Sequence, residues 1–225
     1  MTVPDKRLLD PGPPQAFGLQ RRLPVPFFSM AVIGASVARF LWVISLAGDQ
    51  NPDYRWAING PLIRDGEWWR IFAGAIEHGG AIHILMNMFV VYSLGFALER
   101  MLGTWRFAII SIVGCLGSGA FALFFAFNQY TVGASGMILS WAGALLPIAN
   151  RAGRQSLVVW LVQIAVISLI PGVSWQGHLG GFVFGLLCGL ALRAGPRAFP
   201  YLAPLLLFLA SAAVVVAAHP ERFPI

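Results

Sequence analysis

The chain has 225 residues, of which 58% are hydrophobic and only 11% are charged. This composition excludes a soluble globular domain, which would need a charged surface, whereas here the charges lie between long apolar runs. The net charge of +6 does not indicate a nucleic-acid binder, because the basic residues flank apolar runs and form no stripe interleaved with aromatic residues. We therefore expect an integral, multi-pass membrane protein.

Residues 1–26 are rich in proline and charge and predict a short disordered tail in the cytosol. They show neither the early apolar region of a signal peptide nor the acid-free, proline-free composition of a mitochondrial presequence. Beyond the tail, apolar runs separated by polar breaks predict seven membrane helices. Their expected ranges are 27–47, 81–98, 105–127, 135–149, 156–171, 178–192 and 200–218.

The distribution of Lys and Arg predicts the orientation of these helices. With the N-terminus in the cytoplasm, ten basic residues face inward and four face outward, as the positive-inside rule requires. The C-terminus is then external, and we expect a bacterial inner membrane because the chain is compact and carries no organellar address. Arg39 stands alone within the first helix, where it snorkels, pairs with an acid of the following loop, or makes another polar contact.

Helices two, four and six run from outside to inside, so their N-terminal ends share one side of the membrane. His83, Ser135 and His178 lie near those ends, 15 to 17 residues before the first cytoplasmic arginine. At 1.5 Å per residue this is about 22 to 26 Å, within a hydrocarbon core about 30 Å thick. The three groups are therefore expected beneath the outer surface, in a water-filled cavity into which the loop 128–134 dips.

Two motifs carry a nucleophile and a base. Gly133 and Gly136 flank Ser135 at the start of a helix, where they allow a tight turn and leave backbone N–H groups free to stabilise an oxyanion. His178 is the natural base, and Gly181 and Gly185 behind it lie on one helix face that lets another helix approach closely.

His83 and Asn87 share a helix face one turn apart. Either alone is explained by interhelical hydrogen bonding, but beside a Ser/His pair they suit oxyanion binding. Cys115 and Cys188 fall inside apolar segments and are interpreted as packed thiols.

Together these motifs resemble the rhomboid family of intramembrane serine proteases, over residues 27 to 193. Further matches are Trp69-Arg70 in the long loop and Glu99-Arg100 followed by Gly103 after the second helix. The resemblance implies an all-α membrane protein, with a six-helix catalytic core over 27–193 and an added transmembrane helix and short external tail over 194–225. Leu139 departs from the family, which often has an aromatic residue there, beneath the histidine.

The resemblance also implies a catalytic dyad of Ser135 and His178, with His83, Asn87 and the N–H of Ser135 as the oxyanion hole. Transmembrane proteins entering from the lipid bilayer are the expected substrates, with no metal, organic cofactor or nucleic acid involved. The oligomeric state is left open. Two alternatives are a non-catalytic relative that binds membrane clients and a small transporter or channel. The first usually lacks the serine or histidine, and the second predicts polar groups continuing to the cytoplasmic side.

Overall fold

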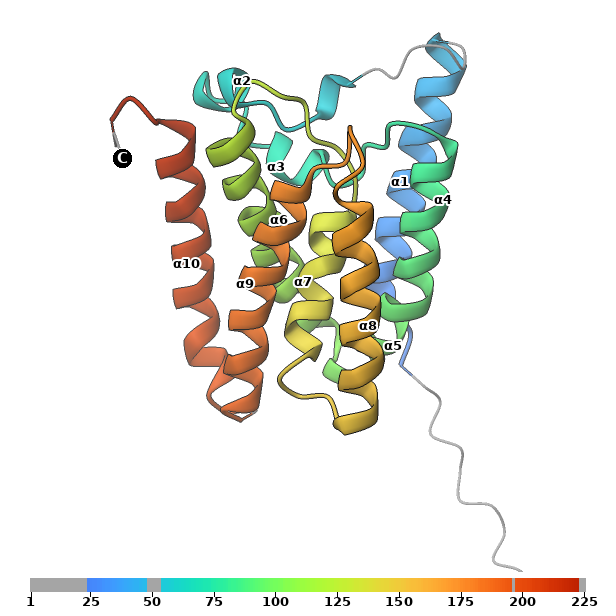
Figure 1. The fold of residues 1–225 in the computed structure, drawn as a ribbon, viewed down its shortest axis with the longest axis vertical. Coiled ribbons are helices and arrows are strands. Elements are labelled where there is room, and N and C mark those ends of the chain that lie inside the picture. The colour runs from blue at the N-terminus through green and yellow to red at the C-terminus, as the bar shows by residue number, and fades with distance from the viewer. Residues whose placement is uncertain (1–23, 48–53, 196, 223–225) are drawn as a thin grey trace, which may run out of the picture.

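The computed structural model describes residues 24–47, 54–195 and 197–222, whose regular secondary structure is helical apart from one isolated β-bridge (Figure 1). Most of the predicted N-terminal tail, residues 1–23, lies outside the described residues. The longer helices are α1 (Phe27–Ala47), α4 (Ala81–Val90), α5 (Phe96–Leu102), α6 (Thr104–Ala126), α7 (Ser135–Leu145), α8 (Arg151–Ile167), α9 (Trp175–Arg193) and α10 (Phe199–Ala218). A π-helical segment, η3 (Val91–Gly95), joins α4 to α5.

These helices run alternately up and down in one bundle, so that α4, α7 and α9 begin at the same end (Figure 1). Among the residues that the structure describes, five stretches are long and apolar enough to cross a membrane: 27–46, 81–102, 104–126, 175–193 and 199–218. α7 has 11 residues and α8 has 17, so both are shorter. Every range predicted from the sequence overlaps a helix.

Several boundaries differ from the sequence-based prediction, among them the end of the second predicted helix, which continues to Leu102, and the end of α8, which lies at Ile167 instead of residue 171. α8 begins at Arg151, five residues before the predicted start, because Asn150 caps it by accepting a hydrogen bond from the Gly153 N–H at 2.8 Å, so its basic first turn is helical. α7 ends at Leu145 instead of residue 149. α9 begins three residues before His178, which places that residue in the first helical turn.

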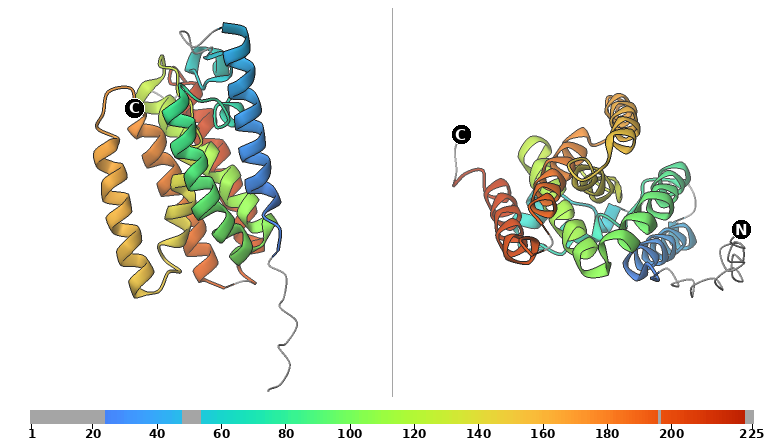
Figure 2. Two further views of the ribbon diagram at one scale, coloured as in Figure 1. Left: turned by 90° about the vertical axis from the view of Figure 1, so that its right-hand side faces the viewer. Right: turned by 90° about the horizontal axis from the view of Figure 1, so that it is seen from below.

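α6 lies in the middle of the bundle: 67% of the residues in its most apolar stretch are buried, compared with 22% for α1. α7 and α9 pack against it and against each other (Figure 2). Along α9, Gly181, Gly185 and Gly189 lie directly on the backbone of α7, where a Cβ atom would collide with main-chain atoms of Gly136, Ser140 and Ala144. Both cysteines, Cys115 and Cys188, are buried in these helices as free thiols.

The long segment between α1 and α4 covers one end of the bundle and contains elements that the sequence did not predict. These are a 3-10 turn, η2 (Tyr54–Trp56), and two short helices, α2 (Gly60–Arg64) and α3 (Arg70–Ala73). Ile58 and Thr131 exchange two backbone hydrogen bonds, which join the segment to the loop before α7. Arg70 holds the segment together, because its guanidinium contacts Glu67 at 2.7 Å and donates to the carbonyls of Arg55 and Ala57.

Arg39 of α1 pairs with Glu77, an acid of the following segment, at 2.8 Å. Both side chains are almost fully buried, and the guanidinium also lies over the Trp56 ring at 4.5 Å. Of the three interpretations of Arg39, pairing with a loop acid therefore describes the structure. The pair ties the first helix to the segment that precedes α4.

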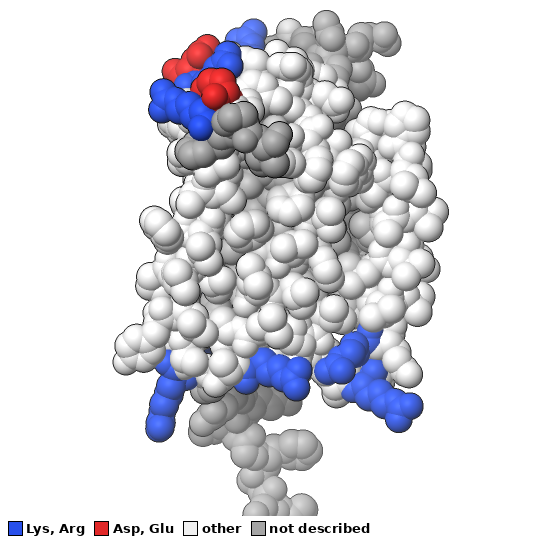
Figure 3. Space-filling view, turned by 60° about the vertical axis from the view of Figure 1, so that its left-hand side comes forward, with Lys and Arg blue, Asp and Glu red and all other residues white. Residues whose placement is uncertain are grey.

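On the face shown in Figure 3, the described charges lie at the two ends of the bundle and none is seen on the surface between them. At the end where α9 passes into α10 the charges seen are basic, whereas the opposite end carries both signs. Basic residues occur at the α5 end, the α6 and α8 starts and the α9–α10 connection: Arg100, Arg106, Arg151, Arg154, Arg193 and Arg197. This is the pattern expected of a bundle that spans a bilayer.

Candidate active site

Ser135 and His178 meet between α7 and α9. The Ser135 Oγ lies 2.8 Å from the His178 Nε2, although the two residues are 43 positions apart in the chain. Each stands in the first turn of its helix, and the glycine contacts between α7 and α9 bring these turns together. A hydroxyl at this distance from an imidazole nitrogen has the geometry of a nucleophile and its general base.

The loop before α7 presses against α4. Gly133 has a φ of +113°, and its N–H donates to the Gly74 carbonyl at 2.8 Å. A Cβ at this position would lie 2.6 Å from the His83 Nε2 and 3.8 Å from the Asn87 Nδ2. Only glycine allows both the backbone conformation and this close approach. The predicted oxyanion residues are thus placed within reach of the loop that carries Ser135.

Hydrogen bonds orient both side chains on α4. The Asn87 amide donates one of its two hydrogens to the His83 carbonyl at 2.9 Å, and the other stays available. The Gly79 N–H points at the His83 Nδ1 at 3.4 Å, which favours a proton on Nε2. The N–H groups of the first turn of α7, starting with Ser135, have no acceptor within their own helix. The site therefore offers several hydrogen-bond donors beside the Ser135 hydroxyl.

The other predicted motif residues lie away from this pair and have structural contacts. Trp69 stacks on the Arg70 guanidinium in the long segment, at 4.8 Å. Glu99 is buried near the far end of the bundle, where its carboxylate accepts from the backbone N–H groups of Phe28 and Ser29 at 2.9 and 2.8 Å. Arg100 follows it on the surface and donates to the Pro24 carbonyl.

Two residues near the site were not identified from the sequence. Ser168, at the end of α8, places its Oγ 2.7 Å from the His178 Nδ1, on the opposite side of the ring from Ser135. His78 is buried, and its ring packs edge-on against that of His83 with centroids 5.1 Å apart. Burial, together with the nearby His83, lowers the pKa of His78 to about 4. Neither residue has a sequence signal beyond its type.

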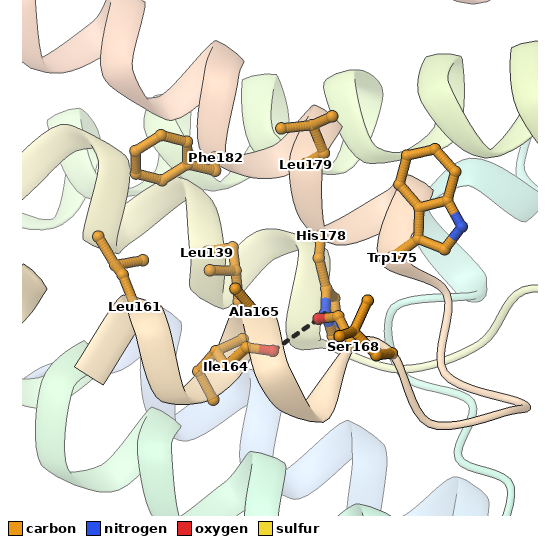
Figure 4. A pocket seen from close by; sticks show the side chains of 10 residues that line it. Leu139, Leu161, Ile164, Ala165, Ser168, Trp175, His178, Leu179 and Phe182 are labelled. Atoms are coloured by element: carbon orange, nitrogen blue, oxygen red, sulfur yellow. Dashed lines mark hydrogen bonds between the residues drawn. The ribbon is translucent and has the colours of Figure 1, made fainter. Parts of the chain in front are cut away.

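An apolar cavity of about 350 Å³ lies beside His178, between α7, α8 and α9 (Figure 4). Leu139, Leu161 and Phe182 form much of its wall, and Ser168 and His178 supply its polar groups. Within the described part of the chain, no group of three or more His, Cys, Asp or Glu side chains is placed to hold a metal ion.

A family model, the Rhomboid domain, matches residues 65–195, which include all four residues predicted for the dyad and oxyanion hole. The chain belongs to the rhomboid family. Among rhomboid relatives, the Rhomboid protease GluP of Bacillus subtilis is 31% identical over 180 residues, which are 74% of this chain and 35% of that protein. The Rhomboid-type serine protease 2 of Emericella nidulans is 31% identical over 147 residues, 59% of this chain and 28% of that one.

An uncharacterized protein of Mycobacterium bovis, Mb1372, aligns over a similar share of both proteins. It is 32% identical over 187 residues, which cover 73% of this chain and 77% of that protein. The first rhomboid relatives are longer, and this chain spans between about a third and a half of their length.

Proposed function

We propose that this rhomboid protein is an intramembrane serine endopeptidase, which cleaves transmembrane segments of other membrane proteins near the outer surface. The observation that carries the proposal is the 2.8 Å contact between the Ser135 Oγ and the His178 Nε2, made between two helices of a family with relatives named as serine proteases. A membrane interior offers few reasons to hold a hydroxyl against an imidazole. General-base activation of a nucleophile is one of them.

In this mechanism the His178 Nε2 accepts the Ser135 proton while the Oγ attacks the scissile carbonyl carbon. The proton then passes from His178 to the leaving amine as the peptide C–N bond breaks, which leaves an acyl-enzyme on Ser135. A water molecule, deprotonated by the same imidazole, attacks the ester, and His178 returns that proton to the Ser135 Oγ as the ester bond breaks and the new carboxyl end is released. The reaction requires a nucleophile, a base and water, and no metal or organic cofactor.

The oxyanion formed at each attack needs donors that are already in place. The backbone N–H of Ser135 supplies one, because the first turn of α7 leaves it without an intrahelical acceptor. The free hydrogen of the Asn87 amide and the Nε2–H of His83 supply two more from α4. Removing one such donor in a serine protease costs about 10²- to 10³-fold in turnover.

The proposed architecture is a six-helix catalytic core over residues 27–193, with α10 and the external tail in the 194–225 segment as an addition. The basic end of the bundle faces the cytoplasm, so α1 starts inside and the C-terminus is external. A bacterial inner membrane is the proposed location. Transmembrane proteins and the bilayer are the partners, and segments that unwind readily are favoured because a helical amide is shielded by its own hydrogen bonds.

A fluorophosphonate probe tests the activity directly, because it reacts only with a serine that a base has activated. Purified protein in detergent or native vesicles is expected to label, and Ser135→Ala to abolish the labelling. His178→Ala is expected to lower the labelling rate about 10²- to 10⁴-fold, which is the usual contribution of a general base. Incubation with single-span substrates, followed by sequencing of the fragments, then locates the cut.

The two alternatives give different results in the same experiments. A client-binding relative without activity leaves the wild type unlabelled but still retains membrane proteins on purification. A transporter also leaves it unlabelled and moves a solute across sealed vesicles. Wild-type labelling that persists in Ser135→Ala contradicts the proposed nucleophile.

A further inference from the structure

Ser168 makes the second contact of the His178 imidazole. The serine is 7% exposed at the end of α8, and its Oγ lies 2.7 Å from Nδ1, while Ser135 occupies Nε2 at 2.8 Å. Three side chains from three helices therefore form one hydrogen-bonded row. A serine near a helix end commonly bonds back to a carbonyl of its own helix, and Ser168 does so as well. The contact with a histidine distinguishes it.

The position of each proton in this row follows from the acceptors. The Ser168 Oγ lies 2.7 Å from the carbonyl oxygen of Ile164. A carbonyl oxygen only accepts, so the single hydroxyl proton of Ser168 must lie between these two oxygens. The same hydroxyl then accepts from His178, which places the ring proton on Nδ1. Nε2 is left with a free lone pair facing the Ser135 hydroxyl, as a general base requires.

The surroundings of the ring make this second contact important. Position 139, one turn after Ser135 on α7, holds leucine. Leu139 borders the apolar cavity, and His178 borders it as well (Figure 4). The space beside the imidazole is thus open on one side. Hydrogen bonds at both nitrogens hold the ring beside this open space.

We propose that Ser168 is a positioning residue for the reaction, which fixes the tautomer and the orientation of His178 so that Ser135, His178 and Ser168 act as one unit. This inference rests on the proposed protease function. It assigns to α8 a role beyond packing, since α8 supplies the group that decides which imidazole nitrogen carries the proton.

Labelling kinetics with the fluorophosphonate probe test the proposal in three variants. Ser168→Ala is expected to slow the labelling of Ser135 roughly fivefold to tenfold, the effect of losing one hydrogen bond. Ser168→Thr keeps the hydroxyl, and the adjoining cavity has room for the extra methyl group, so the rate returns to within about twofold of the wild type. Ser93→Ala is the matched control, because Ser93 also bonds to the carbonyl four residues earlier but contacts no histidine.

The ring proton itself is read by ¹⁵N NMR of histidine-labelled protein, with His178→Ala used to assign the signal. The wild type is expected to carry the proton on Nδ1, and Ser168→Ala to shift population to the Nε2–H form. An unchanged tautomer in Ser168→Ala, or equal labelling rates in Ser168→Ala and the wild type, overturns the proposal. A wild type that does not label contradicts the protease function instead, and the NMR result still decides the role of Ser168.

Discussion

Replacing Gly181 by alanine tests whether the spacing of α7 and α9 sets the reactivity of Ser135. A Cβ on Gly181 would collide with the carbonyl oxygen of Gly136 and would lie 2.7 Å from its carbonyl carbon and 3.0 Å from its Cα. Ordinary van der Waals contact begins at 3.4 Å, so relieving the contact with the carbonyl carbon alone separates the two backbones by at least about 0.7 Å. All three obstructing atoms are main-chain atoms, so no side-chain rotation relieves the clash.

That separation acts directly on the dyad. It extends the 2.8 Å contact between Ser135 and His178 to about 3.5 Å, beyond the range of a good hydrogen bond. A misplacement of about 1 Å can cost on the order of a hundredfold in rate, so we expect labelling of Ser135 to fall tenfold to a hundredfold. Overpacking of this kind also costs about 1 to 3 kcal/mol of stability. Labelling rate and thermal unfolding in detergent measure the two effects separately.

Two other glycines provide the controls. Gly180 faces α6, where a Cβ would lie 2.7 Å from the Phe121 Cβ, so Gly180→Ala strains a different helix pair and is expected to lower stability with a smaller loss of labelling. Gly34 in α1 has open space around it, and alanine there is expected to stabilise the helix by about 0.5 to 1 kcal/mol. The reasoning is refuted if Gly181→Ala labels at the wild-type rate, or if Gly180→Ala slows labelling equally at equal stability.

Three further predictions concern the segment before α4 and the loop before α7. Glu77→Ala removes the ion-pair partner of the buried Arg39 guanidinium and is expected to lower stability more than the double change Arg39→Met with Glu77→Leu, as thermal unfolding in detergent would show. His78 has a pKa of 6.5 in the unfolded chain and of about 4 in the folded chain. The stability of the wild type relative to His78→Asn should therefore fall by about 3 kcal/mol as the pH drops from 6.5 to 4. A difference in unfolding free energy that stays constant over this pH range contradicts the prediction. Gly133→Ala should slow probe labelling at least about tenfold, because the new Cβ would displace His83. A shift of about 1 Å in the reacting groups can cost about a hundredfold in rate. Unchanged labelling would exclude this role for the glycine.

The helices were predictable from the sequence where one physical signal dominates. Long apolar runs gave the ranges of α1, α6 and α10 to within a residue, because burial in lipid sets their length. The start of α8 was missed because its first turn is basic and the apolar criterion discards it, although Asn150 is a good N-cap. The short helices α2 and α3 were missed because each is held by contacts with distant parts of the chain rather than by its own periodicity.

The same distinction explains what was seen of the site. Ser135 and His178 stand in motifs with glycines at fixed spacing, and such motifs can be recognised from the amino-acid sequence alone. Ser168 has no motif, and its contact with His178 depends on how α8 sits beside α9, which is a matter of tertiary packing. The role of Arg39 was open for the same reason, since its partner Glu77 is one of several acids in the following segment.

The two halves of the site are held by different means. α7 and α9 meet backbone to backbone through glycines, so the spacing of the two helices that carry Ser135 and His178 does not depend on side-chain rotamers at these contacts. α8 buries only Leu157 within its helical span and faces the cavity, so few contacts fix the position of Ser168. The first turns of α7 and α9 therefore stay together, while the proposed hold on the His178 ring depends on a loosely packed helix. A displacement of α8 alone would leave these turns in contact but would remove the hydrogen bond at the His178 Nδ1.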